Sequence, residues 1–350
     1  MIRPGPRNLI TDVQGILVGN AEDHHVRTGV TVVLAEEAEA AIAAVDVRGG
    51  APGTCNTTAV HPGGIVERAD AVVLSGGSAF GLAAVGGVMA ALAARERGFA
   101  VASVRVPIVL GAILFDLLNG GDKAWGDEPP YRTLARRAAE RAGGDFAQGN
   151  AGAGLGARAG ALKGGLGSAS FAYVEDGEPI TVGSVVAANP AGSVLIPGTQ
   201  TFWAWALEQA GELGGQRPPE EPLRGAALDQ SFPEIGGANT AIAVVATDAT
   251  LDRNQAQRLA TMAHDGLARA IRPAHTPLDG DTIFVLATGR RGRIAPTAGL
   301  ARLGMLAADC VARAVARGVY EAEDLGELRS YRSLRADRSG RQETTRTATR

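Results

Sequence analysis

The stretch GGANTAIAVVATDATL, residues 236–251, places two glycines, an alanine and an Asn-Thr pair directly before an apolar, β-branched run. The run predicts a buried strand that begins at Thr240. A strand start needs only a turn residue or two, so Asn239-Thr240 is either turn punctuation or a bond that the protein cuts in itself. Cutting would give Thr240 a free α-amine, whose ordinary pKa near 7.7 to 8.0 suits a base for its own hydroxyl. The glycines would permit the strained backbone that such a cut requires.

The composition is typical of a glycine-rich soluble enzyme with a core of small aliphatic side chains. The chain has 350 residues, of which 45% are hydrophobic, only 4% are aromatic and 48 are glycine. A net charge of -3, with both signs spread along the chain, argues against a nucleic-acid partner and a polybasic membrane anchor. Cys55 and Cys310 are too few for a metal cage or a disulfide scaffold. The amino terminus lacks a secretory pattern, so we expect a cytoplasmic protein with reduced thiols.

Alternating strand and helix patterns run along most of the chain. The uncharged stretch 71–94 predicts a short buried strand and a core helix rather than a membrane span. Helices are expected at 78–97, 131–142, 253–271 and 295–317, and strands at 29–35, 39–47, 69–76, 167–175, 180–189, 240–248 and 281–288. This mixed order favours an α+β layered domain. Residues 211–237 predict an exposed, mobile loop before the cut, and residues 327–350 a disordered tail.

Two other chemistries have partial patterns. The segment GAGLGA, residues 152–157, with Glu175 beyond it, resembles part of a dinucleotide-binding fingerprint, which would make the chain an oxidoreductase. Here, however, further glycines lead into a strand-like run instead of opening a helix. Ser78 stands at a strand-to-helix turn, as a nucleophile elbow would, but Phe80 replaces the glycine of that motif. Neither pattern has the context that its chemistry needs.

The triplet Asp279-Gly280-Asp281 precedes the last predicted strand. An Asp-Gly pair at that place is ordinary turn chemistry. Two carboxylates two residues apart can also face the same way, and their repulsion would raise the pKa of one of them enough for proton transfer. The residues alone leave both interpretations open.

Several separated segments together resemble the L-aminopeptidase/D-esterase family of self-cleaving hydrolases. They are RGGAPGT (48–54), LSGGSAFGLAA (74–84), VRVPIV (104–109), KGGLGSAS (163–170), residues 236–251 and LDGDTIFVLATG (278–289). The Asn-Thr pair and the Asp-Gly-Asp triplet look most like the nylon-oligomer hydrolase branch. The resemblance implies a four-layer αββα sandwich of the N-terminal-nucleophile type. It also implies one domain, residues 1–326, cut into an α subunit (1–239) and a β subunit (240–350) that usually assemble as a homotetramer.

The resemblance assigns catalytic roles residue by residue. Thr240 matches the nucleophile, and Asp279 and Asp281 match the acidic pair that orients it and moves protons. Lys163 matches a lysine beside the nucleophile, where positive charge keeps the amine neutral and stabilises anionic intermediates. Asn189 matches an asparagine whose amide donates to the oxyanion. No metal or organic cofactor is implied.

One departure from the family concerns the segment ILFDL, where the family often has a tyrosine at the position of Phe115. The oxyanion hole would then depend on Asn189 and backbone amides. Phe115 and Ser78 are assigned to substrate binding. The expected substrate is a small peptide, amino-acid amide or oligoamide, and the alternative is a relative that binds a small ligand without turnover, as loss of the phenol would allow.

Overall fold

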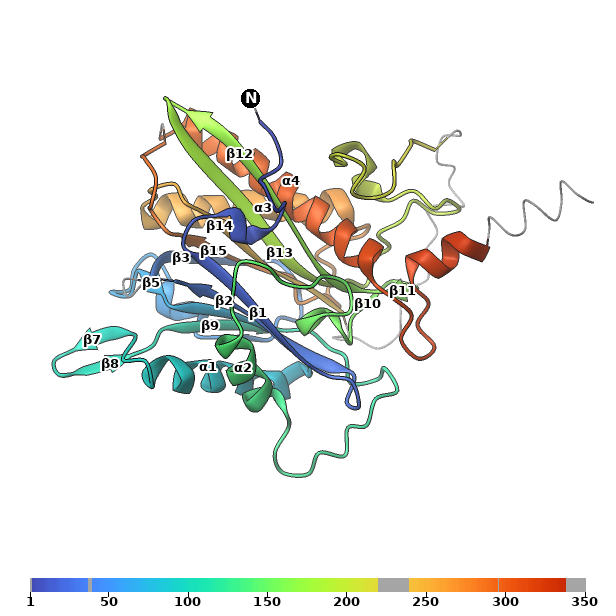
Figure 1. Ribbon diagram of the computed structural model, residues 1–350, viewed down its shortest axis with the longest axis horizontal. Helices are drawn as coiled ribbons and strands as arrows, with labels where there is room; N and C mark the ends of the chain where they lie inside the picture. The colour runs from blue at the N-terminus through green and yellow to red at the C-terminus, as the bar shows by residue number, and fades with distance from the viewer. Residues whose placement is uncertain (1, 37–39, 220–238, 295, 338–350) are drawn as a thin grey trace, which may run out of the picture.

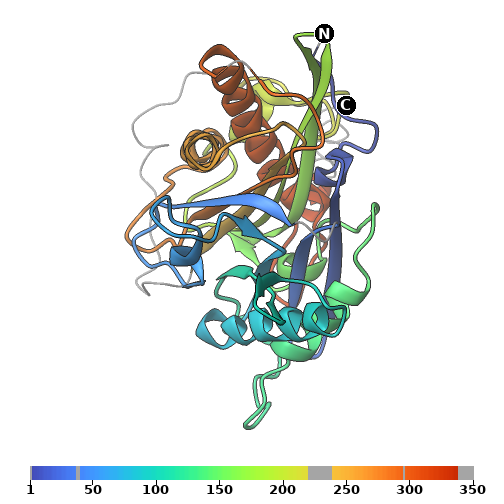
Figure 2. The same ribbon diagram turned by 90° about the vertical axis from the view of Figure 1, so that its left-hand side faces the viewer.

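The computed structural model describes residues 2–36, 40–219, 239–294 and 296–337. Two sheets lie face to face, each covered by two helices on its outer side (Figures 1 and 2). The layer order is therefore α, β, β, α, as predicted. One hydrophobic core fills the space between the sheets, and one further core lies between each sheet and its own pair of helices.

The six-stranded sheet carries the stretch on which the fold depends. Its order is β12 (Gly165–Glu175), β13 (Glu178–Asn189), β14 (Thr240–Thr247), β15 (Thr282–Ala287), β3 (Ala41–Val47) and β5 (Arg68–Ala69). Helices α3 (Arg253–Ala270) and α4 (Ala298–Glu321) cover its outer face. In β14, Ala243 and Val245 face these helices while Ile242 and Val244 face the other sheet. Burial on both faces explains why the strand is a continuous apolar run.

The second sheet has five strands, and α1 (Ala83–Ala93) and α2 (Tyr131–Glu140) cover it. Its order is β1 (Ile16–Asp23), β2 (Thr28–Ala35), β6 (Ala71–Ser75), β9 (Val109–Ile113) and β4 (Thr54–Cys55). Two small hairpins, β7–β8 (Phe99–Val101, Val104–Val106) and β10–β11 (Arg158–Ala159, Leu162–Lys163), stand apart. Short 3-10 turns are η1 (Ile10–Asp12), η2 (Thr57–Val60), η3 (Ser78–Leu82), η4 (Gly152–Gly154) and η5 (Trp203–Leu207). Within the described ranges, no helix is both long and apolar enough to cross a membrane.

All seven predicted strands and four predicted helices are present, with ends shifted by a few residues. Residues 71–94 form β6, η3 and α1, as predicted. Strands β1 and β9 were not predicted, nor were the two- and three-residue strands β4, β7, β8, β10 and β11. Strand β1 (ILVGNAED) contains Gly, Asn and two acids, and β9 (VLGAI) has five residues and a central Gly, so neither shows a clear β pattern.

Part of the predicted disordered tail is folded. Residues 331–337 are helical, and the buried ring of Tyr331 lies 4.6 Å from that of Phe202. The Tyr331 hydroxyl donates to the Gln200 carbonyl at 2.9 Å. A buried aromatic side chain and packing of Leu334 against the core hold this segment, which the scarcity of apolar residues concealed. Residues 338–350 lie outside the described residues.

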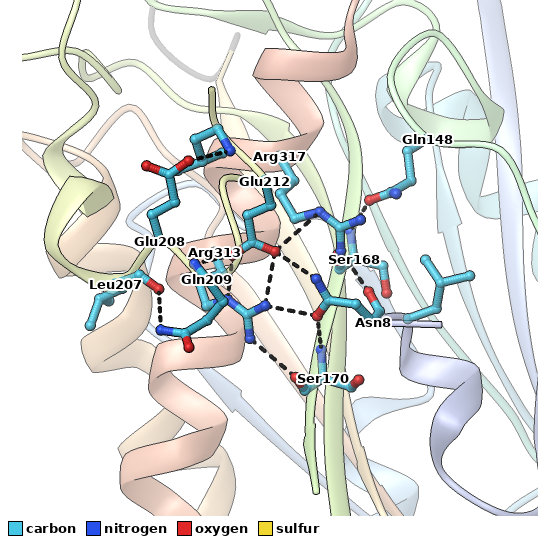
Figure 3. Close-up of polar contacts among 12 residues, drawn as sticks. Asn8, Gln148, Ser168, Ser170, Leu207, Glu208, Gln209, Glu212, Arg313 and Arg317 are labelled. Carbon is cyan, nitrogen blue, oxygen red and sulfur yellow. Dashed lines mark hydrogen bonds and ion pairs between the residues drawn. The ribbon is translucent and has the colours of Figure 1, made fainter. Parts of the chain in front are cut away.

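The start of the predicted mobile loop is also anchored. Leu213 is buried, and the carboxylate of Glu212 accepts two hydrogen bonds from Arg313 of α4, at 2.6 and 2.8 Å (Figure 3). Arg317 lies 3.6 Å from the same carboxylate, and the Asn8 amide donates to it at 2.6 Å. This Glu212 network joins three parts of the chain: the amino-terminal segment, helix α4, and the segment that follows η5. The rest of the predicted loop, residues 220–237, lies outside the described residues.

Candidate active site

The Asn239-Thr240 pair lies at one end of the six-stranded sheet. Thr240 is the first residue of β14 and is opposite Asn189, the last residue of β13. On the other side, Asn239 forms a bridge with Asp279, just before β15. The topology therefore brings the pair, the asparagine and the acidic triplet together from three separate parts of the chain.

The peptide bond between Asn239 and Thr240 is buried and polarised. The Thr240 hydroxyl donates to the Asn239 carbonyl oxygen, so it lies against the carbonyl group that it would attack. The Gly280 N–H donates to the same oxygen at 3.1 Å. A backbone N–H on that oxygen would stabilise the negative charge that develops there during attack.

The two carboxylates of the triplet have separate partners. Asp281 accepts the N–H of Ala241, the residue after Thr240, at 2.8 Å through one oxygen. Its other oxygen accepts two bonds from His275. Asp279 accepts the N–H of Ala191 at 3.0 Å and both the N–H and hydroxyl of Thr276 at 3.0 and 2.6 Å. In the described part of the chain, neither carboxylate bonds the Thr240 hydroxyl directly.

The pKa of Asp279 is raised, as the triplet predicted, but with a different main cause. Burial raises it most, and the nearby charge of Asp281 adds to the effect. Hydrogen bonds from Thr276 and Ala191 oppose the shift. A carboxyl with a raised pKa can carry a proton closer to neutral pH than an ordinary aspartate can.

The segment RGGAPG holds the triplet in place from the side of β3. The N–H groups of Arg48 and Gly49 donate to the Asp281 carbonyl at 3.0 and 3.2 Å, and the Ala51 N–H donates to the Asp279 carbonyl at 2.8 Å. A Cβ atom added at Gly49 would lie 2.2 Å from the backbone nitrogen of Asp281 and 2.4 Å from the backbone carbonyl oxygen of Asp279. The backbones approach so closely that only glycine fits.

Replacing Gly49 by alanine is therefore expected to displace the triplet and to slow any chemistry at Thr240 by about a hundredfold or more, as a shift near 1 Å does in active sites. The measurement is a time course of intact mass for the freshly purified protein, followed by turnover of an aminoacyl anilide. Gly86→Ala in α1 is the control, because a Cβ there would meet nothing nearer than 4.0 Å. Equal rates for both variants would contradict the packing argument.

Lys163 is fully buried at the end of the β10–β11 hairpin. Its ammonium donates to the carbonyls of Gly154 and Gly164, both at 2.8 Å. Burial lowers the pKa of Lys163 to about 7, against the opposing charge of Asp116. Burial thus favours the neutral amine, whereas the two carbonyl acceptors favour the ammonium.

Asn189 lies between Thr240 and the residues assigned to substrate binding. Its side-chain oxygen accepts the Arg158 N–H at 2.8 Å, and its amide donates to the Phe115 carbonyl at 3.3 Å. Ser78 has a left-handed φ of 51°, and its N–H donates to the carbonyl of Leu114, the neighbour of Phe115, at 2.9 Å. The backbone around Ser78 and Phe115 is thus linked to the end of β13.

The dinucleotide pattern lacks its structural context. Residues 152–154 form η4, and β10 follows at Arg158, so no strand-to-helix turn opens on these glycines. A Cβ at Gly154 would lie 2.0 Å from the Leu166 nitrogen, which shows that this glycine serves close packing of the chain. Two contributors at the site were missed from the sequence, His275 and the N–H of Gly280. The only signal was the position of His275 four residues before the triplet, in HTPLDGD.

The four-layer fold is that of the N-terminal-nucleophile hydrolases. The L-aminopeptidase D-Ala-esterase/amidase of Ochrobactrum anthropi, described as a variant of that fold, superposes with a TM-score of 0.68 at 24% identity, covering 95% of this chain and 94% of that one. The β-aminopeptidase of a Burkholderia species gives a TM-score of 0.70 at 25% identity over the same shares.

The chain belongs to peptidase family S58, whose sequence profile matches residues 8–331. An uncharacterized aminopeptidase of Mycobacterium tuberculosis is 44% identical over 354 aligned positions, covering 93% of this chain and 98% of that protein. The 6-aminohexanoate-oligomer endohydrolase of a Kocuria species is 31% identical, covering 81% of this chain and 76% of that protein. Membership in this family of aminopeptidases and amidases supports an amide hydrolase.

Proposed function

We propose that the protein cuts its own Asn239–Thr240 bond and then hydrolyses small amides with the new amino-terminal threonine. One observation carries this proposal. The Thr240 hydroxyl lies against the Asn239 carbonyl, and the Gly280 N–H donates to the same carbonyl oxygen. The Thr240 oxygen adds to the carbonyl carbon and its proton passes to the amide nitrogen. The C–N bond breaks to leave an ester, and water then releases the Asn239 carboxylate and the free Thr240 hydroxyl and amine.

In turnover, the free amine of Thr240 serves as the base for its own hydroxyl. The hydroxyl attacks the substrate carbonyl, the leaving amine takes the proton, and water hydrolyses the acyl-enzyme ester. Asp281 holds the backbone next to Thr240, and Asp279 carries protons, which its raised pKa favours. Asn189 donates its side-chain amide to the oxyanion, and the positive charge of Lys163 stabilises the anionic intermediates. Phe115 and Ser78 contact the substrate.

The substrate class proposed is small peptides, amino-acid amides and oligoamides. The similarity to a 6-aminohexanoate-oligomer endohydrolase, a β-aminopeptidase and several aminopeptidases supports this range. A relative that binds such molecules without turnover is the alternative, since Phe115 offers no phenol to the oxyanion. Turnover by the fully cut protein would exclude it.

The fragments 1–239 and 240–350 would remain one folded unit, because β14 lies between β13 and β15 and the Glu212 network joins the two fragments. We further propose a cytoplasmic homotetramer. The β7–β8 hairpin, which exposes Phe99, Val101, Val104 and Val106, supports contact with another subunit.

The test is the intact mass and amino-terminal sequence of the purified protein, followed by a screen of aminoacyl anilides and linear oligoamides. Two chains, the second opening Thr-Ala-Ile-Ala, together with turnover, are the expected result. A chain that stays whole after long incubation would overturn self-cleavage. Complete cleavage with no turnover in the screen would favour the binding alternative.

A further inference from the structure

His275 makes two hydrogen bonds to one carboxylate oxygen of the proposed site. Its ring Nδ1 lies 2.8 Å from Oδ2 of Asp281, and its backbone N–H donates to that oxygen at 3.0 Å. The other oxygen of Asp281 accepts the Ala241 N–H. Asp281 therefore bridges the imidazole of His275 and the backbone N–H of Ala241, the residue that follows Thr240. The left-handed φ of His275, 57°, is unusual for a residue other than glycine.

Several other titratable groups lie near the His275 ring, and each has its own partner. His264 of α3 contacts its ring edge-on at 5.0 Å, and the Nε2 of His264 bonds the Asp46 carbonyl at 2.9 Å. Burial lowers the pKa of His264 to about 4, so His264 is neutral at working pH. From β3 and the residue after it, Asp46 and Arg48 form a pair with each other at 3.3 Å. On its own segment, His275 bonds Asp281, and Asp279 lies two residues before that carboxylate and bonds Thr276, the neighbour of His275.

We propose that His275 is a positioning residue that orients Asp281 and, when protonated, offsets its charge, and thereby sets the lower end of the pH range in which the Asp279–Asp281 pair works. This inference rests on the proposed function and adds to it a residue that does not touch the substrate. Its physical basis is that the charge of Asp281 raises the pKa of Asp279. A positive imidazole beside Asp281 weakens that repulsion, so Asp279 ionises at lower pH than it would beside a neutral partner.

The informative variant is His275→Asn. Asparagine tolerates left-handed backbone, and its side-chain amide can donate to Asp281 as Nδ1 does, but it cannot become charged. Because imidazole changes its charge between about pH 5 and 8, we expect near wild-type kcat/KM at pH 8.5 and an acidic limb shifted upward by about one pH unit. His275→Ala is expected to lose activity across the whole range. His61→Asn, at an exposed histidine, is the control.

The pH dependence of kcat/KM distinguishes failure of the His275 proposal from failure of the proposed function. A wild type that is cut and active while His275→Asn has a parallel pH profile would overturn the role of His275 and leave the proposed function intact. A wild type without cleavage or turnover would remove the proposed function, and the pairing would then be tested without activity. For that test, the imidazole signals are followed by NMR in an uncut Thr240→Ala background, and His275→Asn identifies the signal of His275.

Asp281→Asn should change the NMR signals of the His275 ring, because the variant replaces the carboxylate oxygen that lies 2.8 Å from Nδ1. Circular dichroism checks that this variant is folded, and Asp279→Asn, which alters a carboxylate that bonds Thr276 and Ala191 instead of the ring, should change those signals less. Unchanged His275 ring signals in Asp281→Asn would overturn the proposed pairing.

Discussion

A Thr240→Ala chain is expected to remain a single polypeptide of 350 residues and to lose amide turnover by at least about a thousandfold. The variant removes the oxygen that would attack the Asn239 carbonyl, and no ester can form without it. Intact mass reports the cut, and release of anilide from an aminoacyl substrate reports turnover. Both losses are expected together, because the base in turnover is the amine that the cut releases.

Two further variants test whether the hydroxyl itself is responsible. Thr240→Ser keeps a hydroxyl and is expected to cut and to turn over substrate at a reduced rate. Thr247→Ala removes a buried hydroxyl from the other end of β14, where it donates to the Thr181 carbonyl, so it costs packing without touching the site. It should therefore be cut normally. Cleavage of Thr240→Ala at wild-type rate would assign the cut to another group.

The part of the proposed site that consists of neighbouring residues in the chain could be predicted from the sequence. Asn239-Thr240 and Asp279-Gly280-Asp281 are each contiguous, and each leads into an apolar strand whose burial the pattern indicated. The bridge between Asn239 and Asp279 then follows from two parallel strands that start side by side. For these residues, strand prediction and chemistry pointed to the same place.

The rest of the site depends on backbone atoms and on approach distances, which residue types do not encode. Two contacts could therefore not be predicted from residue types. They are the hydrogen bond from the Gly280 N–H to the Asn239 carbonyl and the close approach of the Gly49 backbone to the triplet. His275 was visible in the sequence but had no metal or triad spacing, since its partner is a carboxylate six residues away across a turn. The folded end of the chain was hidden for a similar reason, because one buried tyrosine anchors a polar segment.

The largest stability effect outside the site is expected for Glu212→Gln. The Glu212 carboxylate is the anion for fully buried Arg313 and largely buried Arg317. Breaking a buried pair while its cation remains typically costs about 3–5 kcal/mol in the free energy of unfolding. Burial would raise the pKa of Glu212, but the hydrogen bond and charge of Arg313, the charge of Arg317 and the hydrogen bond from Asn8 together hold the pKa below its ordinary value. This stabilisation is therefore present above the unfolded carboxyl pKa of about 4.3 and declines as pH falls below it.

Urea unfolding in the uncut Thr240→Ala background measures this effect, because there the chain is a single polypeptide. Glu140→Gln is the matched control, since the Arg136–Glu140 pair is exposed and contributes at most about 0.5 kcal/mol. Adding Arg313→Met to Glu212→Gln should cost less than Arg313→Met alone, because the anion that it would strand is already gone. If Glu212→Gln and Glu140→Gln were equally mild, the network would not be a stabilising junction. In the cut protein, the same pair would connect two separate chains, so Glu212→Gln should then also promote dissociation of the 240–350 fragment on dilution.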